Sequence, residues 1–180
     1  MNCLFVGSFN PITTSHELIA KDLLNNKIID YLYFIPVNSN KNDLVSIEDR
    51  IKMIKLIINK KEEVLNIYDF TKDGLFNYDV LNKINNKYNI THIVMGGDLF
   101  YKFKTFKNNN IILNNYKLII IKRDNEIEEY LNKYYKDNNI ILITKTYDGS
   151  SKLAKENINK DNNYLNKKVL DYIKENKLYN

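Results

Sequence analysis

The sequence predicts a single α/β domain built on a parallel sheet with helices on both faces. Three observations support this prediction. Short apolar runs alternate with amphipathic segments over all 180 residues. Several of those runs are apolar at consecutive positions, as strands buried on both faces are. No Gly/Ser-rich linker and no internal repeat divides the chain, so residues 1–180 are expected to form one domain.

The expected strands and helices follow one another along the chain. The runs expected as strands are residues 3–9, 30–37, 64–70, 92–98, 117–123 and 140–145. The segments expected as helices are residues 15–26, 47–58, 78–85, 125–135 and 167–176. Apolar residues at 18, 19, 23 and 24 lie on one face of the first helix, and those at 47, 51, 54, 57 and 58 do so in the second. The last helix is expected to pack beside the sheet.

Composition narrows the functional classes. The chain is 44% hydrophobic and 12% aromatic, which is typical of a folded domain. No apolar run reaches the ~18 residues of a membrane helix, and no secretory signal pattern opens the chain. We therefore expect a cytoplasmic protein with no membrane partner. Cys3 is the only cysteine, which excludes an internal disulfide and a cysteine-rich zinc site.

The charge balance points to a small anionic ligand. The net charge of +5 suits a nucleotide but is too diffuse to indicate nucleic acid. Residues 101–110, YKFKTFKNNN, interleave aromatics and lysines, as single-strand binders do. The family resemblance described below accounts for this segment better, so no nucleic-acid partner is expected.

Residues 7–16, GSFNPITTSH, form the most informative stretch, because they lie where the first strand ends and the first helix begins. Ligands of such sheets bind beyond the carboxyl ends of the strands. Gly7 would let the backbone approach a ligand closely. Pro11 would fix the turn and hold Asn10 in an extended conformation. The stretch is neither a GxGxxG loop nor a GxxxxGK[ST] loop, so it indicates a phosphate site of another kind.

The beginning of the first helix supports the same interpretation. Thr14 or Ser15 is expected to cap it, and the free N–H groups of a helix N-terminus attract anions. His16 would lie in the first turn and face the same anion. These residues therefore predict a phosphate-binding turn.

GSFNPITTSH resembles the signature of nucleotidyltransferases with an (H/T)xGH motif, in the form G-[ST]-F-[DNS]-P-[IP]-[HT]-x-x-H of the nicotinamide/nicotinate mononucleotide adenylyltransferases. Four later segments resemble that family in the same order, so the resemblance covers nearly the whole chain. They are PVNSNKNDLVSIEDRIKMIKL, MGGDLFYKFKTFKN, DGSSKLAKENI and VLDYIKENKLYN. The resemblance implies a Rossmann-like, doubly wound fold.

It also implies adenylyl transfer in NAD biosynthesis. The 5′-phosphate of nicotinamide or nicotinate mononucleotide would attack the α-phosphorus of ATP, giving NAD or deamido-NAD and pyrophosphate. Since the substrate supplies the nucleophile, positioning and charge stabilisation would carry the rate. Mg²⁺ would accompany ATP, held by the triphosphate and water rather than by a protein metal site. A symmetric homo-oligomer, such as a dimer, is a possible state.

The resemblance assigns roles residue by residue. His16 would contact the ATP phosphates and stabilise the transition state, with Thr13 at the first polar position of the motif and Lys155 as a further catalytic cation. Gly96 and Asp98 would hold the adenosine ribose. The other residues implied in ATP binding are Gly7, Ser8, Phe9, Ser150 and Ser151. Those implied on the mononucleotide side are Asn10, Lys41, Tyr78 and Phe106.

The sequence departs from the family pattern at a few positions. Ser15 stands where the motif has Gly, and Phe106 stands where the family usually has Trp. Lys155 replaces an Arg and loses the fork that grips two phosphate oxygens. Asp79, beside Tyr78, replaces a Thr; facing the pyridine ring it would disfavour nicotinate, which tilts the expectation toward nicotinamide or dual use.

Two other functions stay open from the sequence. Phosphopantetheine adenylyltransferase is the nearest enzymatic rival, although Ser8 and Asn10 match the pyridine-nucleotide branch better. A non-catalytic nucleotide-binding sensor is the alternative of a different class, and the change at Lys155 motivates it.

Overall fold

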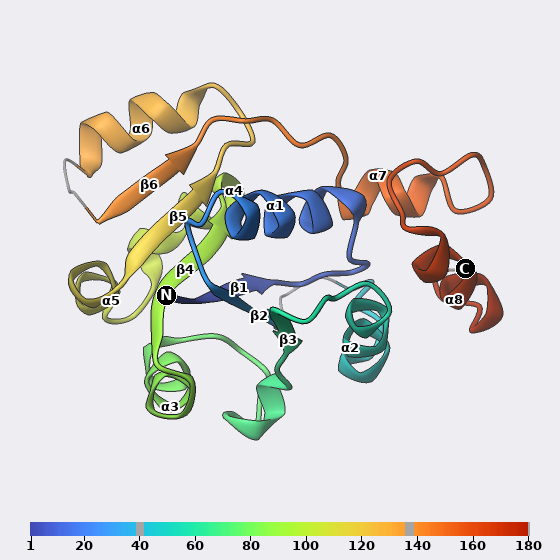
Figure 1. Ribbon diagram of the computed structural model, residues 1–180, viewed down its shortest axis with the longest axis horizontal. Coiled ribbons are helices and arrows are strands. Elements are labelled where there is room, and N and C mark those ends of the chain that lie inside the picture. Colours follow the sequence, from blue (N-terminus) through green and yellow to red (C-terminus); the bar gives the residue numbers. More distant parts are fainter. Residues whose placement is uncertain (39–41, 136–138, 180) are drawn as a thin grey trace.

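A parallel sheet forms the centre of the molecule. The computed structural model describes residues 1–38, 42–135 and 139–179. In this part of the chain six strands lie in the order β3-β2-β1-β4-β5-β6, and every neighbouring pair is parallel (Figure 1). The strands are β1 (Asn2–Gly7), β2 (Tyr31–Pro36), β3 (Glu62–Val64), β4 (Ile90–Gly96), β5 (Lys117–Ile121) and β6 (Ile140–Ile143). This arrangement confirms the predicted fold class.

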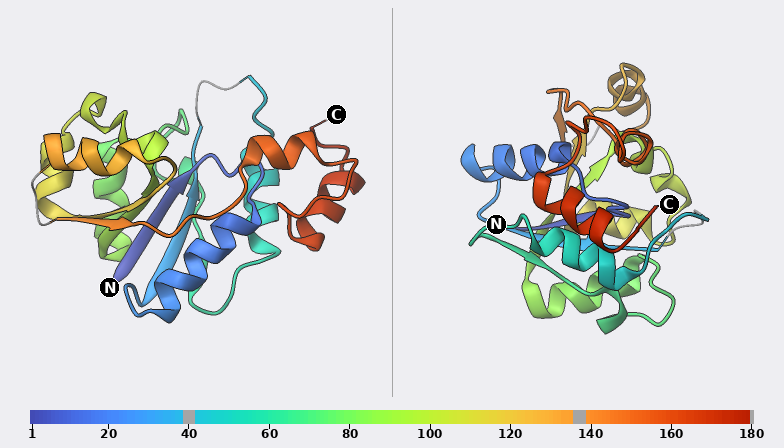
Figure 2. Two further views of the ribbon diagram at one scale, coloured as in Figure 1. Left: turned by 90° about the horizontal axis from the view of Figure 1, so that it is seen from above. Right: turned by 90° about the vertical axis from the view of Figure 1, so that its right-hand side faces the viewer.

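Helices cover both faces of the sheet. The longer ones are α1 (Thr14–Asn25), α2 (Ile47–Lys55), α3 (Tyr78–Tyr88), α6 (Glu126–Tyr134) and α8 (Lys167–Glu175). The shorter ones are α4 (Gly97–Phe100), α5 (Asn109–Asn115), α7 (Ser151–Glu156) and the 3₁₀ turns η1 (Ile67–Asp69) and η2 (Phe103–Thr105). The views of Figure 1 and Figure 2 show α1 on one side of the sheet and α3 on the other.

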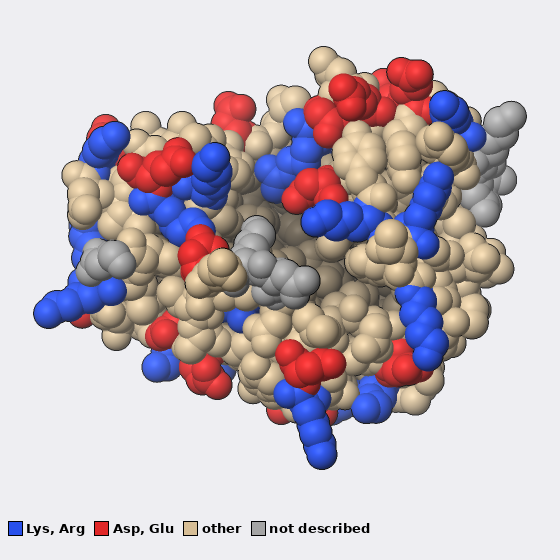
Figure 3. All heavy atoms as spheres, turned by 180° about the vertical axis from the view of Figure 1, so that it is seen from behind, with Lys and Arg blue, Asp and Glu red and all other residues tan. Residues whose placement is uncertain are grey.

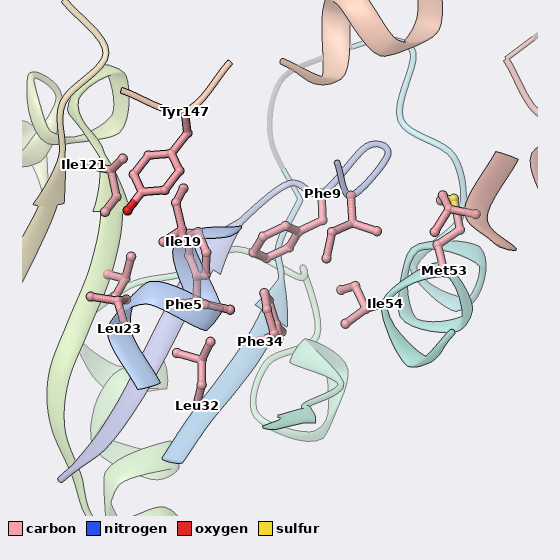
Figure 4. Close-up of a cluster of buried hydrophobic side chains, with 14 of the residues drawn as sticks. Phe5, Phe9, Ile19, Leu23, Leu32, Phe34, Met53, Ile54, Ile121 and Tyr147 are labelled. Atoms are coloured by element: carbon pink, nitrogen blue, oxygen red, sulfur yellow. The ribbon is translucent and has the colours of Figure 1, made fainter. Parts of the chain in front are cut away.

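Alternation along the strands divides the core into two clusters. Successive residues of a strand point to opposite faces, so Cys3 and Phe5 of β1 lie in one cluster and Leu4 and Val6 in the other. The first cluster includes buried residues of α1, α2, α7 and α8, and the second includes buried residues of α3, α4, α5 and α6. Figure 4 shows the first cluster, in which side chains from β1, β2 and α2 meet.

The third predicted strand, residues 64–70, is wrong in its position. β3 ends at Val64, and the chain then turns into η1. The side-chain oxygen of Asn66 accepts the backbone N–H of Tyr68 at 3.1 Å, which closes a local turn in place of strand pairing. Ile67 is fully buried within that turn, so its apolar character reflects burial and not a strand.

The last helix also differs from expectation. Instead of packing beside the strands, α8 lies with α7 at one end of the molecule, next to α2 (Figure 1). The hydroxyl of Tyr172 in α8 donates to Asp49 Oδ1 in α2 at 2.7 Å. The buried residues of α8, Val169 and Ile173, belong to the first core cluster. In the described residues, no helix is both long enough and apolar enough to span a membrane.

Candidate active site

The predicted phosphate-binding motif lies at the point where the strand order reverses. β1 and β4 are neighbours in the sheet although they are far apart in sequence. Both end in glycine, at Gly7 and Gly96. The carboxyl ends of strands at such a switch point form the ligand crevice of open α/β sheets. In Figure 2 β1 and β2 run toward the face shown in Figure 3, where a hollow with charged side chains on its rim opens.

Phe9 anchors the motif in the core. It is buried and its φ of +44° lies in the left-handed region, which costs a non-glycine residue about 1–3 kcal/mol. Its ring meets the rings of Phe5 and Phe34 with centroids 5.3 and 5.5 Å away (Figure 4). The centroid of the His16 ring lies 5.1 Å away. This packing stabilises the strained backbone, so Phe9 supports the turn from beneath.

Asn10 is committed to protein partners. Its side-chain amide donates to the carbonyl of Asp43 at 2.9 Å, and its Oδ1 accepts the Val45 backbone N–H at 3.1 Å and the Tyr179 hydroxyl at 2.9 Å. The side chain is 2% exposed. Asn10 therefore ties the motif to the segment before α2 and to the end of the described chain.

The helix cap falls one position earlier than expected. Thr13, and not Thr14 or Ser15, is the N-cap residue of α1. His16 at position N3 reaches back, and its Nδ1 accepts the Thr13 backbone N–H at 3.1 Å. Ser15 is buried and its hydroxyl donates to the Gly149 carbonyl at 3.1 Å. A residue larger than serine would have to displace this contact, which explains why a small side chain follows Thr14.

The electrostatic state of His16 follows from these contacts. Burial, with a smaller contribution from the Arg123 charge, lowers the pKa of His16 to about 3. The ring is therefore neutral at physiological pH. Because Nδ1 accepts the Thr13 N–H, the one ring proton lies on Nε2. His16 thus offers a fixed N–H donor and no positive charge.

The end of β4 forms the second part of the site. A Cβ on Gly96 would lie 2.5 Å from Asp98 Oδ1 and 3.6 Å from Arg123 Nε. Gly96 thus leaves the space in which the Asp98 carboxylate turns back over the strand end, beside the Arg123 guanidinium. Asp98 is exposed at the start of α4, so its carboxylate is open to a ligand.

The loop before α7 closes the site from a third side. Gly149 has a φ of +104°, and its carbonyl accepts from Ser15 and from Arg123 Nη1, the latter at 3.4 Å. Ser150 caps α7 by accepting the Leu153 N–H at 3.2 Å, while Ser151 Oγ donates to the Pro11 carbonyl at 2.8 Å. The Ser150 hydroxyl thus caps α7, and the Ser151 hydroxyl holds α7 against the motif.

Lys155 lies on α7 and forms an ion pair with Asp43. Its side chain is only 21% exposed. The ammonium of Lys155 therefore contacts the segment before α2, to which Asn10 is also hydrogen-bonded. Lys41, the predicted phosphate contact on the substrate side, lies outside the described residues.

The site also contains two arginines to which the sequence pattern assigns no role. Arg123 follows β5 at the carboxyl edge of the sheet, a position that sequence reasoning could have singled out. Arg50 is 1% exposed and donates to the carbonyls of Val45, Ser8 and Val37 and to Asn38 Oδ1, at 2.8 to 3.1 Å. It binds the motif to the ends of β2 and the start of α2. Since three of its four target groups are backbone carbonyls, the sequence does not reveal this role.

The two aromatic residues expected to bind the mononucleotide lie on the face of the sheet that carries the second core cluster. Tyr78, the first residue of α3, and Phe106, after η2, are half-buried against the second core cluster. The Phe106 ring contacts Phe103 with centroids 5.8 Å apart. Asp79 is exposed in the first turn of α3.

The donor set fits a magnesium ion that arrives with a nucleotide. Within residues 1–38, 42–135 and 139–179, no three His, Cys, Asp or Glu side chains lie together as metal ligands. Apart from the separate carboxylates of Asp43 and Asp98, the groups around the motif are hydroxyls, N–H donors and basic side chains, which bind phosphate oxygens rather than metals. Such a site would hold the metal through the triphosphate.

Comparisons with known proteins decide the family. The cytidylyltransferase-like family model matches residues 4–159. A probable nicotinate-nucleotide adenylyltransferase from Endomicrobium trichonymphae is 32% identical, over 98% of this chain and 97% of the relative. The chain belongs to the nicotinate-nucleotide adenylyltransferase branch of these nucleotidyltransferases. A second member, from Acholeplasma laidlawii, is 30% identical over 99% of this chain and 97% of its own.

Solved structures of this family share the fold. The Plasmodium falciparum nicotinic acid mononucleotide adenylyltransferase complexed with NaAD superposes with a TM-score of 0.80, at 24% identity, over 99% of this chain and 96% of its own. A putative nicotinate-nucleotide adenylyltransferase from Vibrio parahaemolyticus gives 0.69 at 17% identity, over 99% and 94%. These matches confirm the Rossmann-like fold that the sequence resemblance implied.

Proposed function

We propose that the protein transfers the adenylyl group of ATP to nicotinate or nicotinamide mononucleotide, forming deamido-NAD or NAD and pyrophosphate. One observation supports it above the others: the motif after β1 presents a neutral His16 whose Nδ1 is occupied by the Thr13 N–H. The remaining Nε2–H is a preorganised donor for a phosphate oxygen. The family of the chain, which consists of nucleotidyltransferases, supports the same reaction.

The mechanism follows from the groups around the motif. The mononucleotide 5′-phosphate attacks the α-phosphorus of ATP, and pyrophosphate leaves on the opposite side. His16 donates through Nε2 to the transferring phosphate, and Arg123 and Lys155 offset the charge that develops. Asp98 accepts from the ribose hydroxyls of ATP. A magnesium ion bound to the triphosphate would stabilise the leaving pyrophosphate.

Nicotinate is the acceptor that we favour. The relatives are named for nicotinate, and the argument for nicotinamide required Asp79 to face the ring. Asp79 is exposed and complements the N-terminus of α3, as an acidic residue in a first helical turn does. Ring stacking on Phe106 and the cytoplasmic location remain predictions.

The test is product identification by mass after incubation with Mg-ATP and, separately, nicotinate mononucleotide, nicotinamide mononucleotide and phosphopantetheine. A dinucleotide from a pyridine mononucleotide, with an equal amount of pyrophosphate, is the expected result. Dephospho-coenzyme A formed from phosphopantetheine would support the rival transferase. ATP binding without any product would support the sensor.

A further inference from the structure

The segment that follows α8 reaches back into the proposed site. Lys177 and Tyr179 both have left-handed φ values, of +52° and +63°. The Leu178 N–H donates to the Ile173 carbonyl at 3.0 Å, which reverses the chain after the helix. The φ of Lys177 belongs to this helix end, whereas the φ of Tyr179 lies beyond it and is held by the tertiary contacts of that residue.

Tyr179 completes a closed ring of contacts among four chain segments. Its hydroxyl donates to Asn10 Oδ1 at 2.9 Å, and the Asn10 amide donates to the Asp43 carbonyl at 2.9 Å. The Asp43 carboxylate pairs with Lys155. The Lys155 ammonium lies 5.8 Å from the centroid of the Tyr179 ring, within range of a cation–π interaction. The ring thus links the motif, the segment before α2, helix α7 and the end of α8.

Within this ring Tyr179 acts on two groups of the site at once. Through its hydroxyl it fixes the amide of Asn10, the residue that carries the turn of the motif. Through its aromatic face it restricts the ammonium of Lys155, whose long side chain would otherwise sample many rotamers. A displacement of about 1 Å in a phosphate-binding cation can lower a rate by up to about a hundredfold.

We propose that Tyr179 is a positioning residue for adenylyl transfer, acting through Asn10 and Lys155. This inference rests on the proposed function. It predicts that the hydroxyl and the aromatic face act separately. The hydroxyl holds the Asn10 amide in place, and the aromatic face holds the Lys155 ammonium in place.

The test uses two variants of Tyr179 and a matched control. Tyr179→Phe removes the hydroxyl and keeps the ring, whereas Tyr179→Leu removes both. Tyr172→Phe removes an equivalent hydroxyl from α8, one that donates to Asp49 in α2 and does not touch the motif. For each protein, kcat, KM for ATP, KM for the mononucleotide and the melting temperature are measured.

We expect Tyr179→Phe to lower kcat about tenfold while leaving KM for ATP within about twofold. Tyr179→Leu should also raise KM for ATP, because Lys155 loses its aromatic contact. Tyr172→Phe should lower the melting temperature only. Wild-type kcat in Tyr179→Phe, or an equal kcat loss in Tyr172→Phe, would overturn the inference.

The design separates this inference from the proposed function. Absence of turnover in the wild-type protein would refute the function and, with it, the inference. Turnover in the wild type with unchanged kinetics in Tyr179→Phe would refute the inference alone. If Tyr179→Leu fails to fold, as shown by its circular dichroism, Tyr179→Phe still decides the outcome.

Discussion

His16 depends on four neighbours for its chemistry. The Thr13 N–H occupies Nδ1, Arg123 disfavours a second proton, and the rings of Phe5 and Phe9 pack against the imidazole. The sequence of the motif predicted that a histidine would lie in the first helical turn. It could not show that this histidine is neutral, because its lowered pKa arises from burial and from Arg123, which the fold brings close.

The lowered pKa of His16 predicts a pH-dependent stability. The unfolded chain, with a histidine pKa near 6.5, binds more protons than the native state, with a pKa of about 3. This contribution to the free energy of unfolding is complete above pH 6.5 and is lost as the pH falls toward 3. The slope from this residue should reach at most about 1.4 kcal/mol per pH unit.

The variant His16→Gln isolates this contribution. Glutamine at N3 also caps the N-cap N–H but does not titrate. Urea unfolding between pH 4 and 7 should show the wild type losing more stability than His16→Gln as the pH falls. Parallel curves for the two proteins would contradict the lowered pKa.

Substitution of Arg50 should mainly lower stability, whereas substitution of Arg123 should mainly lower activity. Arg50→Met leaves carbonyls of three segments without their donor, so we expect a loss of about 3–5 kcal/mol in the free energy of unfolding. Arg123→Met, at an exposed position, should change stability by less than about 1 kcal/mol and lower kcat at least tenfold. Urea midpoints and initial rates measure both effects. Equal stability of the two variants would show that the buried guanidinium contacts contribute little.

At the scale of elements, strand–helix alternation predicted the sheet well: five of the expected runs overlap strands, of which β1, β2, β4 and β5 are largely buried and β6 is half-buried. The third run failed where Asn66 diverts the chain into η1. The short helices α4 and α5 gave too little periodicity for prediction. The site could be predicted only in part from the sequence. The family resemblance identified Lys155, but its contact with Asp43 depends on how α7, α8 and α2 pack together.

The loop after η1 offers a test at this scale. Gly74 has a φ of +70°, and a Cβ there would lie 2.4 Å from Asn38 Nδ2. Gly74→Ala should therefore destabilise the protein by about 1–3 kcal/mol. Gly97, in helix α4, would place a Cβ no closer than 3.5 Å to another atom.

Gly97→Ala is the matched control and should leave the melting temperature almost unchanged. Comparable losses in both variants, measured by thermal unfolding, would mean that backbone conformation at Gly74 is not the limiting factor.

At the scale of the whole molecule, the net charge of +5 should attract the anionic nucleotide before it binds. The basic groups around the site attract a triphosphate, and salt screens that attraction. KM for ATP should therefore rise several-fold between about 50 and 500 mM NaCl, with a smaller change in kcat. Steady-state kinetics at both salt concentrations check this, and a KM independent of salt would argue against an electrostatic contribution.

In the proposed reaction, the GSFNPITTSH turn performs adenylyl transfer through His16. The most direct measurement is kcat for dinucleotide formation by His16→Glu, at saturating ATP and mononucleotide. Glutamate keeps the cap of α1, as in a capping box, but presents a carboxylate to the phosphates. We predict a folded protein with kcat lowered at least about a hundredfold. A folded His16→Glu variant with wild-type kcat would show that His16 has no part in the transfer.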